Sequence, residues 1–123
     1  MTVDDSVRVV RGAVCWVDLD PVQGSEANKR RPCVVVSNDA ANTVASRLGR
    51  GVITVLPLTS NTQRVFDFQV LVSAEDSGLA SDTKAQAEQI RAVDVRRITG
   101  QVSVLPVSLM NRIEESMRRH LLL

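Results

Sequence analysis

The chain has 123 residues and a net charge of +1, with 44% hydrophobic and 24% charged residues. This length fits one domain with its own core, and the composition excludes a disordered chain and a strongly basic, general nucleic-acid binder. Trp16, Phe66 and Phe68 are the only aromatic residues. A groove lined by aromatic side chains, for stacked bases or for a proline-rich peptide, is therefore difficult to build.

Cysteine and histidine are too few and too scattered for a metal site. Cys15, Cys33 and His120 show no metal-ligand spacing, so we expect no metal and no cofactor, and two buried free thiols. No apolar stretch reaches the length of about 18 residues that a membrane span needs. The N-terminus carries Asp4 and Arg8 and lacks a signal-peptide pattern, so we expect a cytoplasmic protein.

The first third of the chain predicts two strands separated by a charged loop. Residues 1–9 are interpreted as a loose leader, followed by a single domain over 10–123. Alternating apolar residues predict a strand over 13–19. A polar loop covers 24–31, and the β-branched run at 33–36 predicts a strand buried on both faces.

The rest of the chain alternates short strands with helices. In chain order, the predicted elements are a helix capped by Ser37-Asn38-Asp39 and running through Arg47, strands at 52–58 and 66–72, a turn or short helix at 73–77, and strands at 87–95 and 101–104. Pro106 opens a C-terminal helix, as a favoured first-turn residue. Its apolar stripe is Met110, Ile113, Met117 and Leu121. We expect a mainly β fold with peripheral helices, in which five or six strands form a curled, barrel-like sheet.

The loop before the second strand carries a run of three cations, Lys29, Arg30 and Arg31, directly before Pro32. The residue before proline is restricted to extended geometry, which fixes Arg31 at the start of a strand. An arginine held in this way can bind phosphate through its guanidinium. An ordinary solvated surface loop explains the same residues.

Two further groups of polar residues are candidates. Thr59 and Ser60 end an apolar strand, where their hydroxyls bind a phosphoryl oxygen or satisfy their own turn. Gln86 and Glu88 share one face of a predicted strand. They are either site residues or part of the solvated side of a sheet.

Several motifs recur together in one order and spacing. They are Arg11-Gly12, Trp16, Asp18-Leu19-Asp20-Pro21, Gly24-Ser25-Glu26, Arg31-Pro32, Val34-Val35-Val36, Pro57-Leu58-Thr59-Ser60, Glu88-Gln89-Ile90-Arg91 and the C-terminal helix. Each is weak alone, but the set resembles the MazF/PemK/Kid family of toxin endoribonucleases over residues 10–122.

The resemblance implies an SH3-like barrel, a homodimer and sequence-specific cleavage of single-stranded RNA, controlled by a MazE-like antitoxin. The expected target is messenger RNA, although ribosomal and transfer RNA stay open. Arg31 and Thr59 match the catalytic arginine and threonine of the family, and residues 21–30 match a flexible loop beside its active site. Some relatives carry an arginine and an aspartate where this chain has Gln86 and Glu88.

These assignments suggest a metal-independent mechanism in which the RNA 2′-hydroxyl attacks the adjacent phosphorus, leaving a cyclic phosphate and a 5′-hydroxyl. Arg31 would stabilise the added charge, and Thr59 would bind a phosphoryl oxygen or orient the 2′-hydroxyl. Glu26 is a candidate base, or it orders the loop by pairing with cations. The expected RNA-binding residues are Ser25, Asn28, Lys29, Arg30, Ser60, Gln86 and Glu88.

Two other functions are alternatives. A gyrase-poisoning toxin shares this fold, but its activity resembles a property of a Trp-Gly-Ile ending, whereas this chain ends in Leu121-Leu122-Leu123. A non-enzymatic SH3-like adaptor would need more aromatic residues than this chain has.

Overall fold

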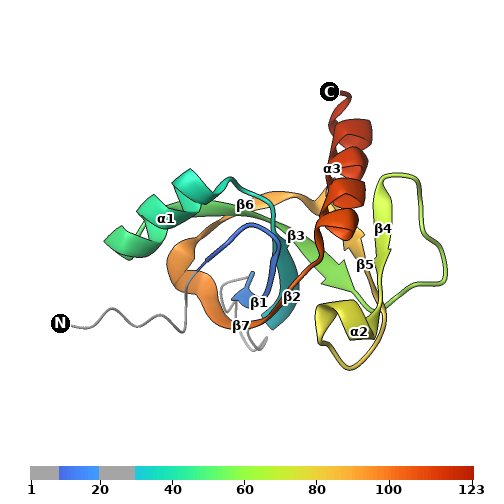
Figure 1. Ribbon diagram of the computed structural model, residues 1–123, viewed down its shortest axis with the longest axis horizontal. Coiled ribbons are helices and arrows are strands. Elements are labelled where there is room, and N and C mark those ends of the chain that lie inside the picture. Colours follow the sequence, from blue (N-terminus) through green and yellow to red (C-terminus); the bar gives the residue numbers. More distant parts are fainter. Residues whose placement is uncertain (1–8, 20–29) are drawn as a thin grey trace, which may run out of the picture.

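Short β-branched segments build one antiparallel sheet in the computed structural model, which describes residues 9–19 and 30–123 (Figure 1). Seven strands pair in the order β4-β5-β3-β2-β1-β7, and β6 pairs with the first half of β3. The strands are β1 Ala13–Asp18, β2 Arg30–Val35, β3 Val52–Thr59, β4 Gln69–Val72, β5 Thr83–Gln86, β6 Arg91–Asp94 and β7 Ile98–Val104. The helices are α1 Asp39–Leu48, α2 Ala74–Ser77 and α3 Val107–Leu121.

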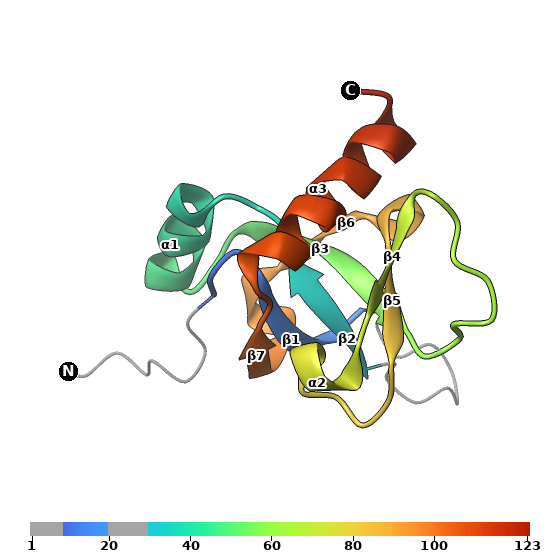
Figure 2. The same cartoon turned by 45° about the vertical axis from the view of Figure 1, so that its right-hand side comes forward.

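The sheet curls because β3 changes partners along its length. Residues 52–55 of β3 pair with β6, whereas Leu58 and Thr59 pair with β5. The β4–β5 pair therefore stands apart from the curled part of the sheet (Figure 2). This arrangement confirms the mainly β, barrel-like fold with a C-terminal helix, although it has seven strands rather than five or six.

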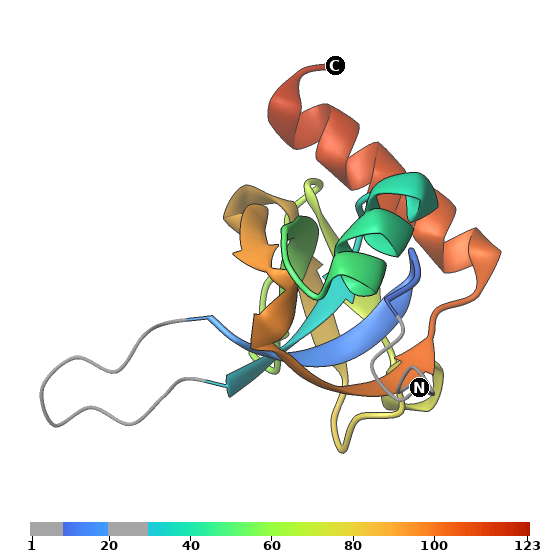
Figure 3. The same ribbon diagram turned by 90° about the vertical axis from the view of Figure 1, so that its left-hand side faces the viewer.

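Alternation along the strands produces two cores, one on each face of the sheet. Cys15, Val17 and Cys33 point into the curled part of the sheet, where Ala45 of α1 closes one end. Val14, Val34, Leu56 and Leu58 point to the other face, where α3 covers them with Leu109, Met110 and Ile113. Burying one such aliphatic side chain contributes about 1.5–3 kcal/mol, so both faces of β1 to β3 are fixed by packing. Figure 3 shows β1 and β7 curving beneath α1 and α3.

Helix α1 follows the predicted signals. The Asn38 side chain accepts a hydrogen bond from the Ala41 amide at 2.8 Å, which caps the first turn. Gly49 ends the helix in a left-handed conformation with a φ of 64°. Pro106 precedes the first turn of α3 as its cap residue rather than lying within that turn.

The predicted strand over 66–72 is wrong in its first half. The Gln69 amide donates to the Phe66 carbonyl at 2.9 Å, and the Phe66 amide donates to the Gln69 side chain at 3.0 Å. These bonds close a turn, so the chain cannot be extended before Gln69. The rings of Phe66 and Phe68 stack 5.3 Å apart, and His120 lies 5.7 Å from Phe68 between ring centroids.

The predicted strand over 87–95 is also corrected. Residues Ala87–Gln89 and Val95–Arg97 form 3₁₀ turns around β6, and β7 begins at Ile98 rather than at residue 101. Strand β5 was not predicted, because Thr83–Gln86 shows no alternation of polar and apolar residues. Its backbone is extended because β3 and β4 pair with it on both sides.

Cys15 and Cys33 are buried free thiols, as predicted, and lie directly opposite each other in β1 and β2. Burial raises the pKa of Cys15 to about 11 and that of Cys33 to about 12. Among the described residues, no helix is long and apolar enough to cross a membrane. The predicted leader at residues 1–9 lies outside the described residues except for Val9, which is buried.

Candidate active site

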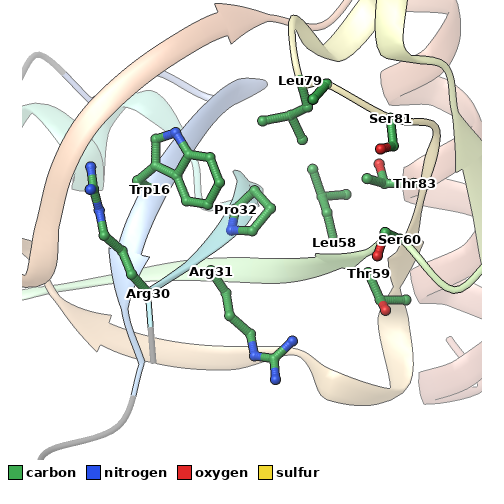
Figure 4. A pocket seen from close by; sticks show the side chains of 11 residues that line it. Trp16, Arg30, Arg31, Pro32, Leu58, Thr59, Ser60, Leu79, Ser81 and Thr83 are labelled. Carbon is green, nitrogen blue, oxygen red and sulfur yellow. The ribbon is translucent and has the colours of Figure 1, made fainter. Parts of the chain in front are cut away.

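A pocket of about 520 Å³ opens at the sheet edge where β2, the end of β3 and the segment before β5 meet (Figure 4). Its lining combines cations, apolar side chains and hydroxyls: Trp16, Arg30, Arg31, Pro32, Leu58, Thr59, Ser60, Leu79, Ala80, Ser81 and Thr83. The sequence-predicted Arg30, Arg31, Thr59 and Ser60 are therefore brought together in space.

Register explains why Arg31 and Thr59 meet. The partners Cys33–Pro57, Val34–Leu56 and Val35–Val55 each have residue numbers that sum to 90. Continued to the strand ends, the same register sets Arg31 opposite Thr59. Opposite residues of an antiparallel pair share a face, and Figure 4 shows both side chains leaving their strands on the same side.

The two side chains differ in how free they are. Arg31 is exposed within β2, in the extended geometry predicted for the residue before Pro32. Thr59 is half-buried, and its hydroxyl oxygen accepts a hydrogen bond from the Asn61 amide at 3.3 Å. The hydroxyl thus caps its own turn and keeps its proton to donate.

Arg30 has a different environment from its neighbour. Its guanidinium carbon lies 5.4 Å from the centre of the Trp16 ring, and its Nε donates to the Thr99 hydroxyl at 2.9 Å. Thr99 in turn donates to the Trp16 carbonyl at 3.3 Å. Arg30 is therefore held against the indole, a cation–π arrangement that fixes the wall of the pocket.

Seven pocket residues were not predicted as site residues: Trp16, Pro32, Leu58, Leu79, Ala80, Ser81 and Thr83. Trp16 was part of the family resemblance, and its place opposite Pro32 in the β1–β2 register is the signal that could have found it. Leu79 and Ser81 lie between α2 and β5, and no pattern in the sequence marks them.

Gln86 and Glu88 do not line the pocket. Gln86 ends β5 opposite Gln69 of β4, and Glu88 lies in the following 3₁₀ turn rather than on a strand. Glu88 accepts a hydrogen bond from the Gln69 side chain at 2.6 Å. Its other carboxylate oxygen is buried without a partner among the described residues.

The remaining predicted site residues, Ser25, Glu26, Asn28 and Lys29, lie outside the described residues. Within residues 9–19 and 30–123, no three His, Cys, Asp or Glu side chains gather closely enough to hold a metal ion.

Comparison with known proteins places this architecture in a family. Residues 10–121 match the family model of PemK-like, MazF-like toxins of type II toxin–antitoxin systems. The chain is 52% identical to Endoribonuclease MazF9 of Mycobacterium tuberculosis, over 90% of this chain and 94% of that protein. It is 32% identical to Endoribonuclease EndoA of Bacillus subtilis, over 89% of this chain and 91% of that protein.

A solved structure agrees with the sequence comparisons. A MazE–MazF crystal structure from Deinococcus radiodurans superposes with a TM-score of 0.75 at 25% identity, covering 93% of this chain and 96% of that chain. The chain therefore belongs to the PemK-like, MazF-like toxin family of type II toxin–antitoxin systems.

Proposed function

We propose that this protein is the toxin of a toxin–antitoxin system and an endoribonuclease that cleaves single-stranded RNA, with messenger RNA as the expected target. Family membership supports the toxin role, and the names of MazF9 and EndoA support RNA cleavage. The observation that carries the proposal is the meeting of Arg31 and Thr59 at the mouth of one pocket, on neighbouring strands.

RNA supplies its own nucleophile, so the protein does not need a metal to generate one. The 2′-hydroxyl attacks the adjacent phosphorus, the P–O5′ bond breaks, and the products are a 2′,3′-cyclic phosphate and a 5′-hydroxyl. The protein then has to hold the two oxygens in line and stabilise the charge that develops on the phosphoryl oxygens.

Arg31 suits the charge, because a guanidinium stays cationic and binds two phosphoryl oxygens at once. Its fixed extended backbone reduces the freedom lost on binding RNA. Thr59 donates its hydroxyl proton to a phosphoryl oxygen or orients the 2′-hydroxyl, while the Asn61 amide restricts its rotation.

Two protons must also move. Glu26 is the proposed base, and ordering of its own loop by pairing with Lys29 or Arg30 is the other role proposed for it. Arg30 is already engaged by Trp16 and Thr99, which makes the ordering role with Arg30 the weaker one. The leaving 5′-oxygen takes up the second proton as the P–O5′ bond breaks.

The pocket wall suits one base of the RNA. Trp16, Pro32 and Leu58 offer apolar surface, and the hydroxyls of Ser60, Ser81 and Thr83 line the same space. Any of the four bases can stack on the indole, whereas hydroxyl groups distinguish between bases by hydrogen bonding to their edges. Sequence preference then depends on these hydroxyls and on the predicted contacts Ser25, Asn28, Lys29, Gln86 and Glu88.

A MazE-like antitoxin, a homodimer and a cytoplasmic site of action complete the proposal. The Deinococcus structure contains MazE with MazF, which supports an antitoxin of that type. A dimer would bring two Arg31 clusters to one RNA-binding assembly and compensate for the low net charge of +1.

A cleavage assay in excess chelator tests the proposal. Purified protein should cut a single-stranded RNA equally well with and without EDTA, and the fragments should carry cyclic phosphate and 5′-hydroxyl ends. Mapping the 5′ ends gives the recognition sequence. Loss of cleavage in EDTA that Mg²⁺ restores would contradict the metal-independent mechanism, and 5′-phosphate ends would contradict attack by the 2′-hydroxyl.

A further inference from the structure

Lys84 lies in β5, next to the strand that carries Thr59. The β3–β5 register sets Lys84 directly opposite Thr59, and β2 lies on the other side of β3. The β2–β3 register, continued beyond its last pair, Cys33–Pro57, sets Arg31 opposite Thr59, so the three residues form a row across three neighbouring strands. Residues paired in this way share one face of the sheet, so Arg31 and Lys84 leave their strands on the same face as Thr59, although Lys84 does not line the pocket itself.

Lys84 is a buried residue, and its ammonium group has no carboxylate partner among residues 9–19 and 30–123. The residue is only 8% exposed, and its Nζ donates to the Arg64 carbonyl at 2.5 Å. The next residue along the row is Leu71, which is apolar.

A buried cation ordinarily pairs with an anion, because removal from water is costly without one. A single neutral carbonyl offsets little of that cost and leaves two of the three ammonium donors free. A group of this kind, on the face of the sheet that carries Arg31 and Thr59, is suited to an anion supplied by a ligand.

We propose that Lys84 is a second phosphate-binding cation of the active site, acting from the β5 side of Thr59 while Arg31 acts from the β2 side. This inference rests on the proposed function, because the anion is the phosphate backbone of the RNA. Neighbouring strands are about 4.8 Å apart, so the backbones of Arg31 and Lys84 are separated by roughly 10 Å. Two long side chains close that distance around the phosphates of one strand.

The Arg64 carbonyl has a supporting role in this arrangement. It holds the ammonium in one position, so little side-chain freedom is lost when phosphate binds. A purely structural role for Lys84, which would tie the segment after Ser60 to β5 through that bond, is the competing explanation. The two roles differ in one respect: only the first requires the positive charge.

Salt dependence separates the two roles. Each phosphate neutralised on a single strand contributes about 0.7 to the slope of log affinity against log salt concentration. Affinity for a mixed-sequence 2′-O-methyl RNA oligonucleotide, which lacks the free 2′-hydroxyl and cannot be cut, would be measured by fluorescence anisotropy between about 50 and 200 mM salt.

Three substitutions of Lys84 and one control make the comparison. Lys84→Gln keeps a donor for the Arg64 carbonyl but removes the charge, Lys84→Met removes both, and Lys84→Arg keeps both. Arg47→Gln removes an exposed charge from the last turn of α1, remote from β5 (Figure 1). Cooperative thermal unfolding shows which variants are folded. If Lys84→Met does not fold, Lys84→Gln alone is enough for the comparison.

We expect Lys84→Gln and Lys84→Met to flatten the slope by about 0.7, which is about a 2.5-fold smaller loss of affinity over a fourfold rise in salt. Lys84→Arg and Arg47→Gln should keep the slope of the unsubstituted protein. An unchanged slope in Lys84→Gln would overturn the inference in favour of a structural anchor. A different result would contradict the proposed function itself: an unsubstituted protein that does not cut RNA.

Discussion

Arg31 owes its position to the residue that follows it. Pro32 restricts Arg31 to extended geometry, and β1 pairing on one side of β2 and β3 pairing on the other complete the constraint. Thr59 is held by the other end of the same register. The residue pair at the centre of the proposed chemistry is therefore positioned by backbone pairing, with no side-chain bond between them required.

Replacing Arg31 by alanine should abolish most activity without unfolding the protein. Loss of one charge-stabilising donor costs on the order of 10²–10³ in rate, and the side chain is exposed. Single-turnover cleavage gives the rate, and circular dichroism checks the fold. Arg31→Lys should be intermediate, since it keeps the charge but loses the two-pronged geometry. Undiminished cleavage by Arg31→Ala would remove Arg31 from the mechanism.

Trp16 gives a direct measure of pocket occupancy, because it is the only tryptophan in the chain. A base stacked on the indole should quench its emission when an uncleavable RNA is added. Trp16→Ala should weaken RNA binding by about 1–3 kcal/mol, as for other base-stacking aromatics, and Trp16→Phe should keep most of the affinity. Emission that stays constant at saturating RNA would place the RNA elsewhere.

A proline and a strand end mark Arg31, Thr59 and Ser60 locally, but it was the family resemblance that predicted them as site residues. Trp16 as a pocket wall, Ser81, Thr83 and Lys84 could not be predicted. Their place in the site depends on which strands become neighbours, and that information is not local. Lys84 in particular lies in β5, a strand that no hydrophobic pattern indicates.

The same distinction holds at the scale of elements. Helices α1 and α3 and strands β1 to β3 carry periodicity, caps or proline signals, and each was predicted to within a few residues. The spacing of Phe66 and Phe68 matches the alternation of a strand, but their rings stack on each other beside His120. Ring packing and the turn closed by Gln69 overrode the local pattern there.

Strands β1 and β2 should make the protein sensitive to alkaline pH through their facing cysteines. Burial raises the pKa of Cys15 to about 11 and of Cys33 to about 12, from a usual value of 9.0. In the unfolded chain both thiols ionise at the lower value. Their contribution to stability is therefore complete well below pH 9 and decreases as pH rises, toward 11 for Cys15 and toward 12 for Cys33, by about 1.4 kcal/mol per thiol for each pH unit.

Denaturant unfolding at pH 8 and at pH 10.5 measures this loss. Cys33→Ala is less stable at both values because it leaves a cavity, but its loss between the two values should be smaller. Ellman's reagent should react with both thiols only after unfolding. An equal alkaline loss in Cys33→Ala would show that another group titrates.

For the whole molecule, charge distribution matters more than net charge. The chain carries only +1 overall, yet Arg31 and Lys84 stand on one face of the sheet around Thr59. If the protein binds RNA as proposed, the binding depends on a local cluster rather than on a general basic surface. A local cluster is also simple to block with one acidic peptide, which is the form of control expected for a toxin.

We predict that the antitoxin and RNA compete for the run of cations Lys29, Arg30 and Arg31. An acidic, partly disordered antitoxin tail would place carboxylates where RNA phosphates otherwise lie and fold as it binds. Lys29→Glu combined with Arg30→Glu should then weaken RNA cleavage and antitoxin binding together. Arg30 adds a second effect, because its loss also releases the Trp16 ring from its cation–π contact.

Titration calorimetry with the cognate antitoxin at several salt concentrations, beside a cleavage assay, measures both losses. The control is Arg47→Glu with Arg50→Glu, at the end of α1. Each substitution removes one positive charge and adds one negative charge, so this pair changes the net charge from +1 to −3, as the Lys29→Glu, Arg30→Glu pair does. The control should bind antitoxin and cut RNA almost normally, because its charges lie outside the pocket. A Lys29→Glu, Arg30→Glu protein that loses cleavage but binds the antitoxin with unchanged affinity at every salt concentration would refute a shared site, because competition requires that both partners use these cations.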